Sequence, residues 1–230
     1  MKFRHSIRNS QSFLFSAKES DEAYYDVAYE LTKKLFIGMA KHALAFNSTK
    51  YDIYEPPFVF RERQLDTLIM PVLVSLCKGL AFAEYPMTRN SKKKGLEIEN
   101  SQGRIDYWCI YKDYSVVIEV KHSYDNFETP CTNDERLLQR WRTMNIVQLG
   151  NVKDEIKHFE EKTKGVIRLG LHFVTSHSST NPSDNIRETY ISQERVMLDR
   201  LYKDLKTVSP DFMSVWEMDK DMVYIEHIQD

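Results

Sequence analysis

Two acidic residues and a lysine stand near the outer ends of two strand-like stretches in residues 103–121, GRIDYWCIYKDYSVVIEVK. β-Branched and aromatic residues fill both stretches, and the polar pair Lys112-Asp113 separates them, which predicts a β-hairpin. A two-residue loop at that pair places Asp106 opposite Glu119. A four-residue loop gives the same register, whereas a three-residue loop does not.

This register has a chemical consequence. Directly opposed residues on neighbouring strands have Cβ atoms roughly 4.5–5.5 Å apart, and like charges at that spacing are unfavourable. The carboxylates of Asp106 and Glu119 therefore need a cation between them, and a hard divalent metal suits carboxylate oxygens. Lys121 lies two residues beyond Glu119, so its side chain shares that face of the strand.

The order Asp106, hairpin, Glu119-Val120-Lys121 resembles the PD-(D/E)XK nuclease superfamily, which includes restriction endonucleases, phage-type exonucleases and RecB-like nucleases. The apolar residues 116–118 that lead to Glu119 fit the same pattern. Residues 103–106 also fit, except that Ile105 stands where the name-giving proline would be. The resemblance covers only residues 103–121.

The resemblance implies metal-dependent hydrolysis of phosphodiester bonds, with DNA favoured as the substrate. Asp106, Glu119 and the carbonyl of Val120 would hold Mg²⁺ or Mn²⁺, and metal-bound water is a better nucleophile because its pKa falls. Lys121 would orient or deprotonate that water.

Glu62 is the candidate for an extra acidic residue of the kind that the family often keeps on a helix before the sheet. An alternative role for Glu62 is purely structural, since an acidic residue in the first turn of a helix complements the helix dipole. Glu84, on the next expected strand, is the reserve if Glu62 points away.

Two other functions stay open. One is a catalytically silent nuclease-like module that binds nucleic acid or a partner protein. The other is a solvated square of charges with the pairs Arg104–Glu119 and Asp106–Lys121, each pair contributing ~0–1 kcal/mol. The apolar residues around the charges favour the nuclease, because they indicate a site at the edge of a core.

Contacts with nucleic acid must come from local patches, because the formal net charge is −2 and no global basic field exists. The basic loop at residues 88–94 could touch phosphates, although most charge runs are only solvated. A weaker candidate is a polar residue on a later helix. These nucleic-acid candidates are Arg89, Lys92, Lys93, Lys94 and Gln148.

The chain of 230 residues is expected to form one α/β (α+β) domain: a restriction-endonuclease-like mixed β-sheet flanked by helices. Its core would span residues 58–176, with a helical addition at 1–57 and an α/β addition at 177–230. Pro71 should kink or split the second helix. The expected helices are 19–46, 58–78, 135–148 resuming to 164, and 186–205, and the further strands are 80–87, 166–175 and a closing pair at 211–217 and 222–227.

Three widely spaced cysteines argue against a disulfide framework and against a zinc or iron–sulfur site. The sequence shows no 18-residue apolar run and no signal-peptide pattern, so we expect no membrane partner and a cytoplasmic location. Whether the chain forms a homodimer or a larger complex stays open.

Overall fold

The computed structural model describes the chain in several ranges, and the account below concerns these residues alone. They are residues 2–6, 12–17, 23–48, 50, 53–54, 57–91, 99–126, 139–140, 143–150, 152, 161–177 and 212–217.

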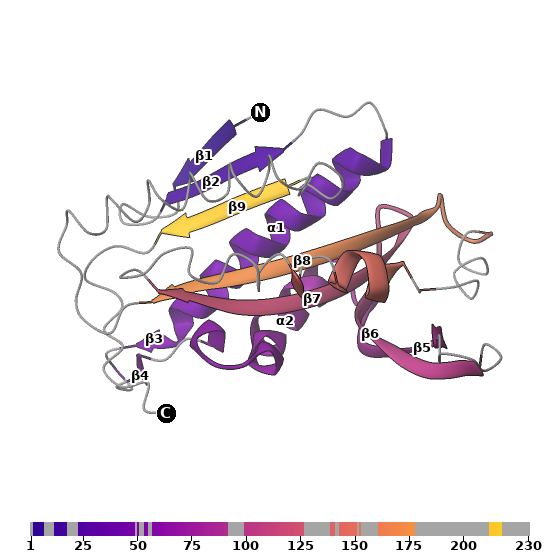
Figure 1. Ribbon diagram of the computed structural model, residues 1–230. Helices are drawn as coiled ribbons and strands as arrows, with labels where there is room; N and C mark the ends of the chain where they lie inside the picture. Colours follow the sequence, from indigo (N-terminus) through magenta and orange to yellow (C-terminus); the bar gives the residue numbers. More distant parts are fainter. Residues whose placement is uncertain are drawn as a thin grey trace.

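A four-stranded mixed sheet forms the centre of the molecule (Figure 1). Its strand order is β5-β6-β7-β8. The first two pairings are antiparallel and the third, between β7 and β8, is parallel. The prediction of a mixed α/β arrangement with three consecutive strands and a later fourth is confirmed. The strands are β5 (Ala81–Ser91), β6 (Glu99–Tyr111), β7 (Tyr114–Asn126) and β8 (Val166–His177).

The β6–β7 hairpin has the predicted two-residue loop. Lys112 and Asp113 have φ values of 49° and 68°, as a type I′ turn requires. The β6–β7 ladder then runs from Tyr111↔Tyr114 to Tyr107↔Ile118. This register is the predicted one, and the next step along it brings Asp106 opposite Glu119.

Beyond that ladder, the sheet forks. β6 continues to pair with β5, as far as Ser91↔Glu99, while β7 continues to pair with β8, as far as Asn126↔His177. Figure 1 shows the β5–β6 pair diverging from the β7–β8 pair. Asp106 and Glu119 therefore sit where the two halves of the sheet separate.

Two helices and two short 3₁₀ turns cover one face of the sheet. α1 (Ala23–Ala45) packs against α2 (Asp66–Leu76), which follows η1 (Pro57–Val59) and η2 (Glu62–Leu65). The helices meet closely at Gly38, where an added Cβ would lie 2.5 Å from Cγ1 of Val72. Their apolar residues form one core with the inward residues of the sheet, including Leu31, Leu35, Ile69, Leu73, Val116, Ile118 and Val120.

The opposite face of the sheet is covered in part by η3 (Thr143–Leu149), a π-helix. Leu149 and Val152 pack there against Val117 of β7 and Ile105 of β6. Val117 alternates with Glu119 and Lys121 along β7, so these three side chains emerge on the η3 side.

The chain termini contribute a second sheet, which the sequence did not suggest. β1 (Lys2–Ser6) pairs with β2 (Ser12–Ala17), and β2 pairs with β9 (Phe212–Glu217). The first strand of the predicted closing pair is present as β9, which pairs with β2, and the predicted second strand, residues 222–227, lies outside the described residues. The expected helix 186–205 also lies outside them. A small pair, β3 (Asn47–Ser48) with β4 (Ile53–Tyr54), lies between α1 and η1.

The helix boundaries differ from prediction in two places. The expected helix 58–78 is two 3₁₀ turns followed by α2, and α2 runs through Pro71 instead of breaking there. The expected helix after Gly150 does not extend to Lys164, because residues 161–164 form turns. The amide of Lys164 donates to the Asp113 carbonyl at 2.8 Å, which ties this turn to the hairpin loop.

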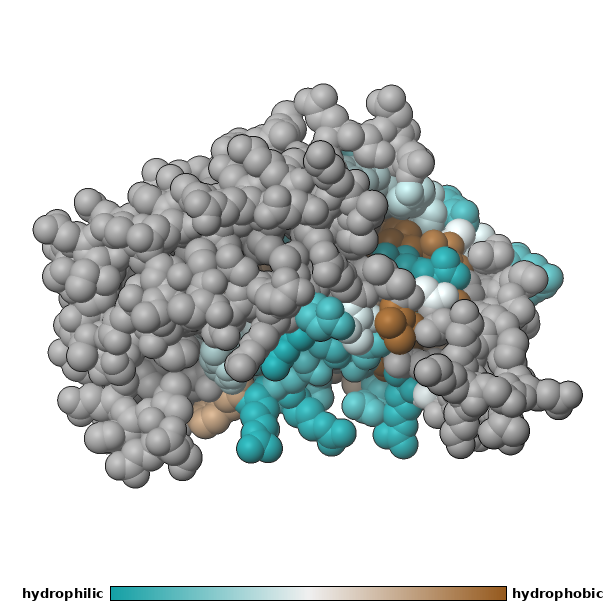
Figure 2. Space-filling model, viewed as in Figure 1, coloured by the Kyte–Doolittle hydropathy of each residue, from teal (hydrophilic) through white to brown (hydrophobic). Residues whose placement is uncertain are grey.

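On the face seen in Figure 2, the coloured side chains are mainly hydrophilic, with smaller hydrophobic patches towards the side where β5 and β6 lie. Within the described ranges, no helix has the length and apolar character needed to cross a membrane.

Candidate active site at the fork of the sheet

The Asp106 carboxylate occupies the gap that opens between β6 and β7. The amide N–H of Val120 donates to Oδ2 of Asp106 at 2.6 Å. A side chain of β6 thus takes the place of backbone pairing one step past the end of the ladder at Tyr107↔Ile118. This hydrogen bond fixes the carboxylate beside the backbone of β7, next to Glu119.

The half-buried carboxyl group of Asp106 and the buried carboxyl group of Glu119 form a pair. Glu119 is 0% exposed. Burial raises the pKa of Asp106, and the negative charge of Glu62 raises it further, whereas the Val120 amide, the Lys121 charge and a side-chain hydrogen bond from Glu119 lower it. The two carboxyl groups are therefore direct neighbours, as the hairpin register predicts. Two carboxyl groups this close, one of them out of water, are stabilised by a shared proton or a cation.

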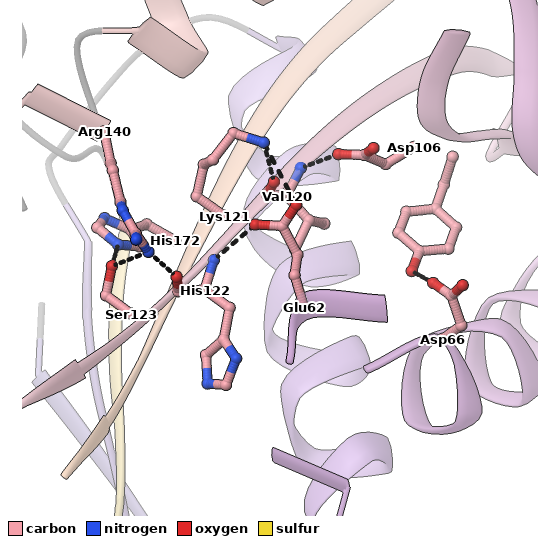
Figure 3. Close-up of polar contacts among 10 residues, drawn as sticks. Glu62, Asp66, Asp106, Val120, Lys121, His122, Ser123, Arg140 and His172 are labelled. Atoms are coloured by element: carbon pink, nitrogen blue, oxygen red, sulfur yellow. Dashed lines mark hydrogen bonds and ion pairs between the residues drawn. The ribbon is translucent and has the colours of Figure 1, made fainter. Parts of the chain in front are cut away.

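Lys121 completes the group from the same strand (Figure 3). Its Nζ donates to the Val120 carbonyl at 2.8 Å and lies 3.5 Å from Oε1 of Glu62. Glu62 also accepts a hydrogen bond from the His122 amide, at 3.0 Å to Oε2. η2 thus brings Glu62 to the edge of β7, and the carboxylate holds the lysine over the site.

Glu84, the reserve acidic residue, is not part of this group. Glu84 has φ of 52° at a point where its strand departs from regular pairing. Its Oε2 lies 3.1 Å from Nη1 of Arg104, and both side chains are exposed. The solvated charge square required an exposed Glu119, whereas Glu119 is buried and Arg104 pairs with Glu84.

A second polar group, which the sequence interpretation missed, lies next along β7 (Figure 3). Ser123 is 4% exposed, and its Oγ lies 2.9 Å from Nε2 of His172. His172 stands beside Lys121 in the parallel register. Nη1 of Arg140 donates to Oγ of Ser123 at 3.0 Å and to the His122 carbonyl.

The period-2 alternation of Glu119, Lys121 and Ser123 is the one sequence signal that could have pointed to this second group. His172 and Arg140 join it through the β7–β8 pairing and the chain between those strands, which the local pattern does not specify. His122 faces the other way: its Nε2 lies 2.8 Å from Oγ1 of Thr175. Since that hydroxyl donates to the Phe58 carbonyl, Nε2 of His122 carries the proton.

Of the residues predicted to contact nucleic acid, only Arg89 and Gln148 lie in the described part of the chain. Arg89 lies in β5, but its side chain is not described, and Lys92, Lys93 and Lys94 lie outside the described residues. Gln148 lies in η3, and its Oε1 is buried without a hydrogen-bond partner in the described part of the chain.

The donor set at the fork has the chemistry that a hard divalent cation requires. The carboxylates of Asp106 and Glu119 and the carbonyl of Val120 are all oxygen donors, which suit Mg²⁺ and Mn²⁺. The Lys121 ammonium, bound to that carbonyl, supplies positive charge there now. Among the described residues, no group of three or more His, Cys, Asp or Glu side chains is arranged to hold a metal, so the backbone carbonyl and water would complete the ligand set.

Comparisons with protein-family models, curated proteins and solved structures find no significant match to this chain.

Proposed function

We propose that this protein is a metal-dependent nuclease of the PD-(D/E)XK type with a restriction-endonuclease-like core, acting on DNA. The observation that carries the proposal is the pair formed by the half-buried Asp106 and the fully buried Glu119 carboxyl groups at the fork of the sheet, with Lys121 two residues further on the same strand. Burying a carboxyl group such as that of Glu119 beside a second carboxyl group is costly to a fold. Titratable groups whose pKa is shifted by burial and by a specific charged neighbour are often found at functional sites.

Mg²⁺ or Mn²⁺, held by Asp106, Glu119 and the Val120 carbonyl, would supply positive charge for the phosphate oxygens and acidify its bound water. The chain's own groups prepare the site for the ion. The Val120 amide holds the Asp106 carboxylate beside the Val120 carbonyl. Val120 would thus supply one metal ligand, its carbonyl, and hold a second, the Asp106 carboxylate, through its amide. Both oxygen donors would therefore be in position before the substrate arrives.

Lys121 acts on the reacting groups. Hydrolysis forms a bond from a water oxygen to phosphorus and breaks a P–O ester bond, while a proton passes to the departing oxygen. The Nζ of Lys121 orients the attacking water and offsets the charge that develops on phosphorus. Glu62 is a positioning residue, since it holds Nζ through an ion pair and anchors itself on the His122 amide.

The competing function is a catalytically silent nuclease-like module that binds nucleic acid or a partner protein. One observation favours it: the described residues hold no ready-made cluster of three metal-binding side chains. The intact set of Asp106, Glu119 and Lys121 favours the enzyme instead.

A gel assay distinguishes these functions. Circular and linear DNA are incubated with the protein in Mg²⁺, in Mn²⁺ and in a chelator. The proposal predicts cleavage with either metal and none with the chelator, and cleavage of the circle would additionally identify an endonuclease. Binding of DNA without cleavage under every metal condition would instead favour the silent module.

A further inference from the structure

Arg140 is an exposed arginine that is held in one position by the strand beside the candidate active site. Its Nη1 donates to Oγ of Ser123, at 3.0 Å, and to the carbonyl of His122. Both acceptors are electrically neutral, and Ser123 is buried. Freezing a long, flexible side chain costs conformational entropy, so a fixed arginine at the surface suggests a ligand for which its orientation matters.

The charges around Arg140 point to an anion. Among the described residues, Arg140 makes no ion pair with a carboxylate, whereas Lys121 close by is paired with Glu62. Burial, followed by the positive charges of Arg140, His122 and Lys121, lowers the pKa of His172 to about 4. His172 is thus neutral at pH 7, and Ser123 and His172 add polar groups without adding negative charge.

The geometry matches a phosphate of the nucleic-acid backbone. A guanidinium presents a planar fork of N–H donors that fits phosphate oxygens, and the named bonds of Arg140 use Nη1 alone. Lys121 and Ser123 are two residues apart on one face of β7, roughly 6.4–6.8 Å by the rise of a strand. This separation joins the two backbone positions on β7 that hold Lys121 and, through Ser123, Arg140, and it is of the order of the distance between neighbouring phosphates of one nucleic-acid strand.

We propose that Arg140, positioned by Ser123 and the His122 carbonyl, binds the backbone phosphate next to the one that is cut. This proposal rests on the proposed nuclease function and adds a substrate-positioning site to it. Arg140 would fix the register of the strand, so that the scissile phosphate lies at Lys121. A contact to phosphate carries no sequence information by itself.

The test measures binding in the absence of cleavage. Fluorescence anisotropy follows a labelled single-stranded and a duplex DNA oligonucleotide with the full chain in chelator, over a range of salt concentrations. Arg140→Gln should weaken binding roughly 10-fold and lower the slope of log K against log salt by about one phosphate contact. Arg140→Lys keeps the charge but loses the fork, so its salt slope should stay near that of the wild type while its affinity falls.

Arg168→Gln is the matched control. Arg168, in β8, is also an exposed arginine that donates to a backbone carbonyl. Its Nη2 lies 3.4 Å from the carbonyl oxygen of Val152. Arg168 lies near the opposite end of β8, so its loss should leave the affinity within about twofold. Circular dichroism and chemical denaturation check that each variant is folded.

A second measurement identifies the phosphate. Backbone phosphates of the oligonucleotide are replaced one at a time by neutral methylphosphonates. At one position, the replacement should weaken binding by the wild type but leave the affinity of Arg140→Gln almost unchanged, because that variant has already lost the arginine that pairs with this phosphate. Equal losses in both proteins at every position would overturn the proposal. So would an unchanged affinity of Arg140→Gln, or a wild type that binds no oligonucleotide.

The outcome is separable from that of the nuclease proposal. If binding depends on Arg140 but no metal supports cleavage, the phosphate site stands and the nuclease proposal fails. If the protein cleaves DNA and Arg140→Gln binds as the wild type does, the nuclease stands and the phosphate site fails.

Discussion

Glu62 links the lysine of the candidate site to the backbone of β7. Its carboxylate joins Nζ of Lys121 to the backbone of His122, and 42% of its side chain is exposed. Glu62→Gln keeps an acceptor for the His122 amide but removes the charge that holds the lysine. We expect the cleavage rate to fall roughly 10- to 100-fold, as for outer residues that orient a metal site, with little loss of stability.

Glu84→Gln is the control for this change, because Glu84 is also an exposed acid in an ion pair but faces Arg104. Its cleavage rate should equal that of the wild type. Equal effects of both variants would mean that Glu62 has no special role at the site.

His172 makes the stability of the fold depend on pH. Its pKa falls from an ordinary 6.5 to about 4, first because it is buried and then because Arg140, His122 and Lys121 are near. The unfolded chain therefore binds more protons between these values, and stability that is fully present above pH 6.5 is lost as the pH falls towards 4. The loss from this residue is on the order of 3 kcal/mol at most.

Urea denaturation at several pH values between 7 and 4.5 measures this effect in the wild type and in His172→Gln. The difference between the two proteins isolates His172 from Asp106, whose raised pKa acts in the opposite sense. Lys112 and Lys34 lower the pKa of Glu30 to about 2. Glu30 therefore changes the pH dependence of stability only below pH 4.5. Parallel stability curves for the two proteins would show that His172 does not titrate as described.

At the scale of elements, the packing of α1 on α2 is tight at one residue. A methyl group on Gly38 would lie 2.5 Å and 2.9 Å from the two γ-carbons of Val72, and a β-branched side chain has little freedom to move away. Gly38→Ala should destabilise the fold by about 1–3 kcal/mol, even though alanine gains ~1 kcal/mol of helix propensity over glycine.

A double variant, Gly38→Ala with Val72→Ala, tests the same contact. Removing the two γ-carbons of Val72 makes room for the methyl group added at residue 38. The double variant should be less destabilised than the sum of the two single changes, as chemical denaturation would show. A Gly38→Ala protein that is more stable than the wild type would contradict the close approach.

Elements that depend on local signals were predictable from the sequence. The hairpin register follows from the position of Lys112-Asp113 between two strand-like runs, and this register alone places Asp106 beside Glu119. The terminal sheet was not predictable in the same way, because Ser12 pairs with Glu217 across nearly the whole chain. His172 likewise reaches the site only through parallel pairing with β7, and parallel partners are joined by long connections that local periodicity does not specify.

The choice between Glu62 and Glu84 shows where periodicity fails. Both are acidic residues near the start of the core. Glu84 lies at a backbone distortion, with φ of 52°, which simple alternation along a strand does not anticipate. Glu62 lies in a 3₁₀ turn that precedes α2, so the expectation of one helix over residues 58–78 gave its position only approximately.

At the scale of the whole molecule, a metal ion that binds the folded state alone should raise the melting temperature. At ten times the dissociation constant, the stabilisation is about 1.4 kcal/mol, which corresponds to roughly 3–6 °C for a chain of this size. Thermal melting with Mg²⁺ or Mn²⁺ against potassium at equal ionic strength measures the shift. Asp106→Asn should abolish it, and a shift that persists in this variant would place the metal elsewhere.

The most direct test of the nuclease account is the rate at which Lys121→Ala cleaves DNA at saturating Mg²⁺. Lys121 acts on the reacting phosphate and water, so its loss should lower turnover by ~10²–10⁴-fold while the metal shift and most of the DNA affinity remain. Lys112→Ala, in the turn of the same hairpin, should cleave as the wild type does. If Lys121→Ala cleaves DNA as fast as the wild type, the site at the fork of the sheet is not the active site.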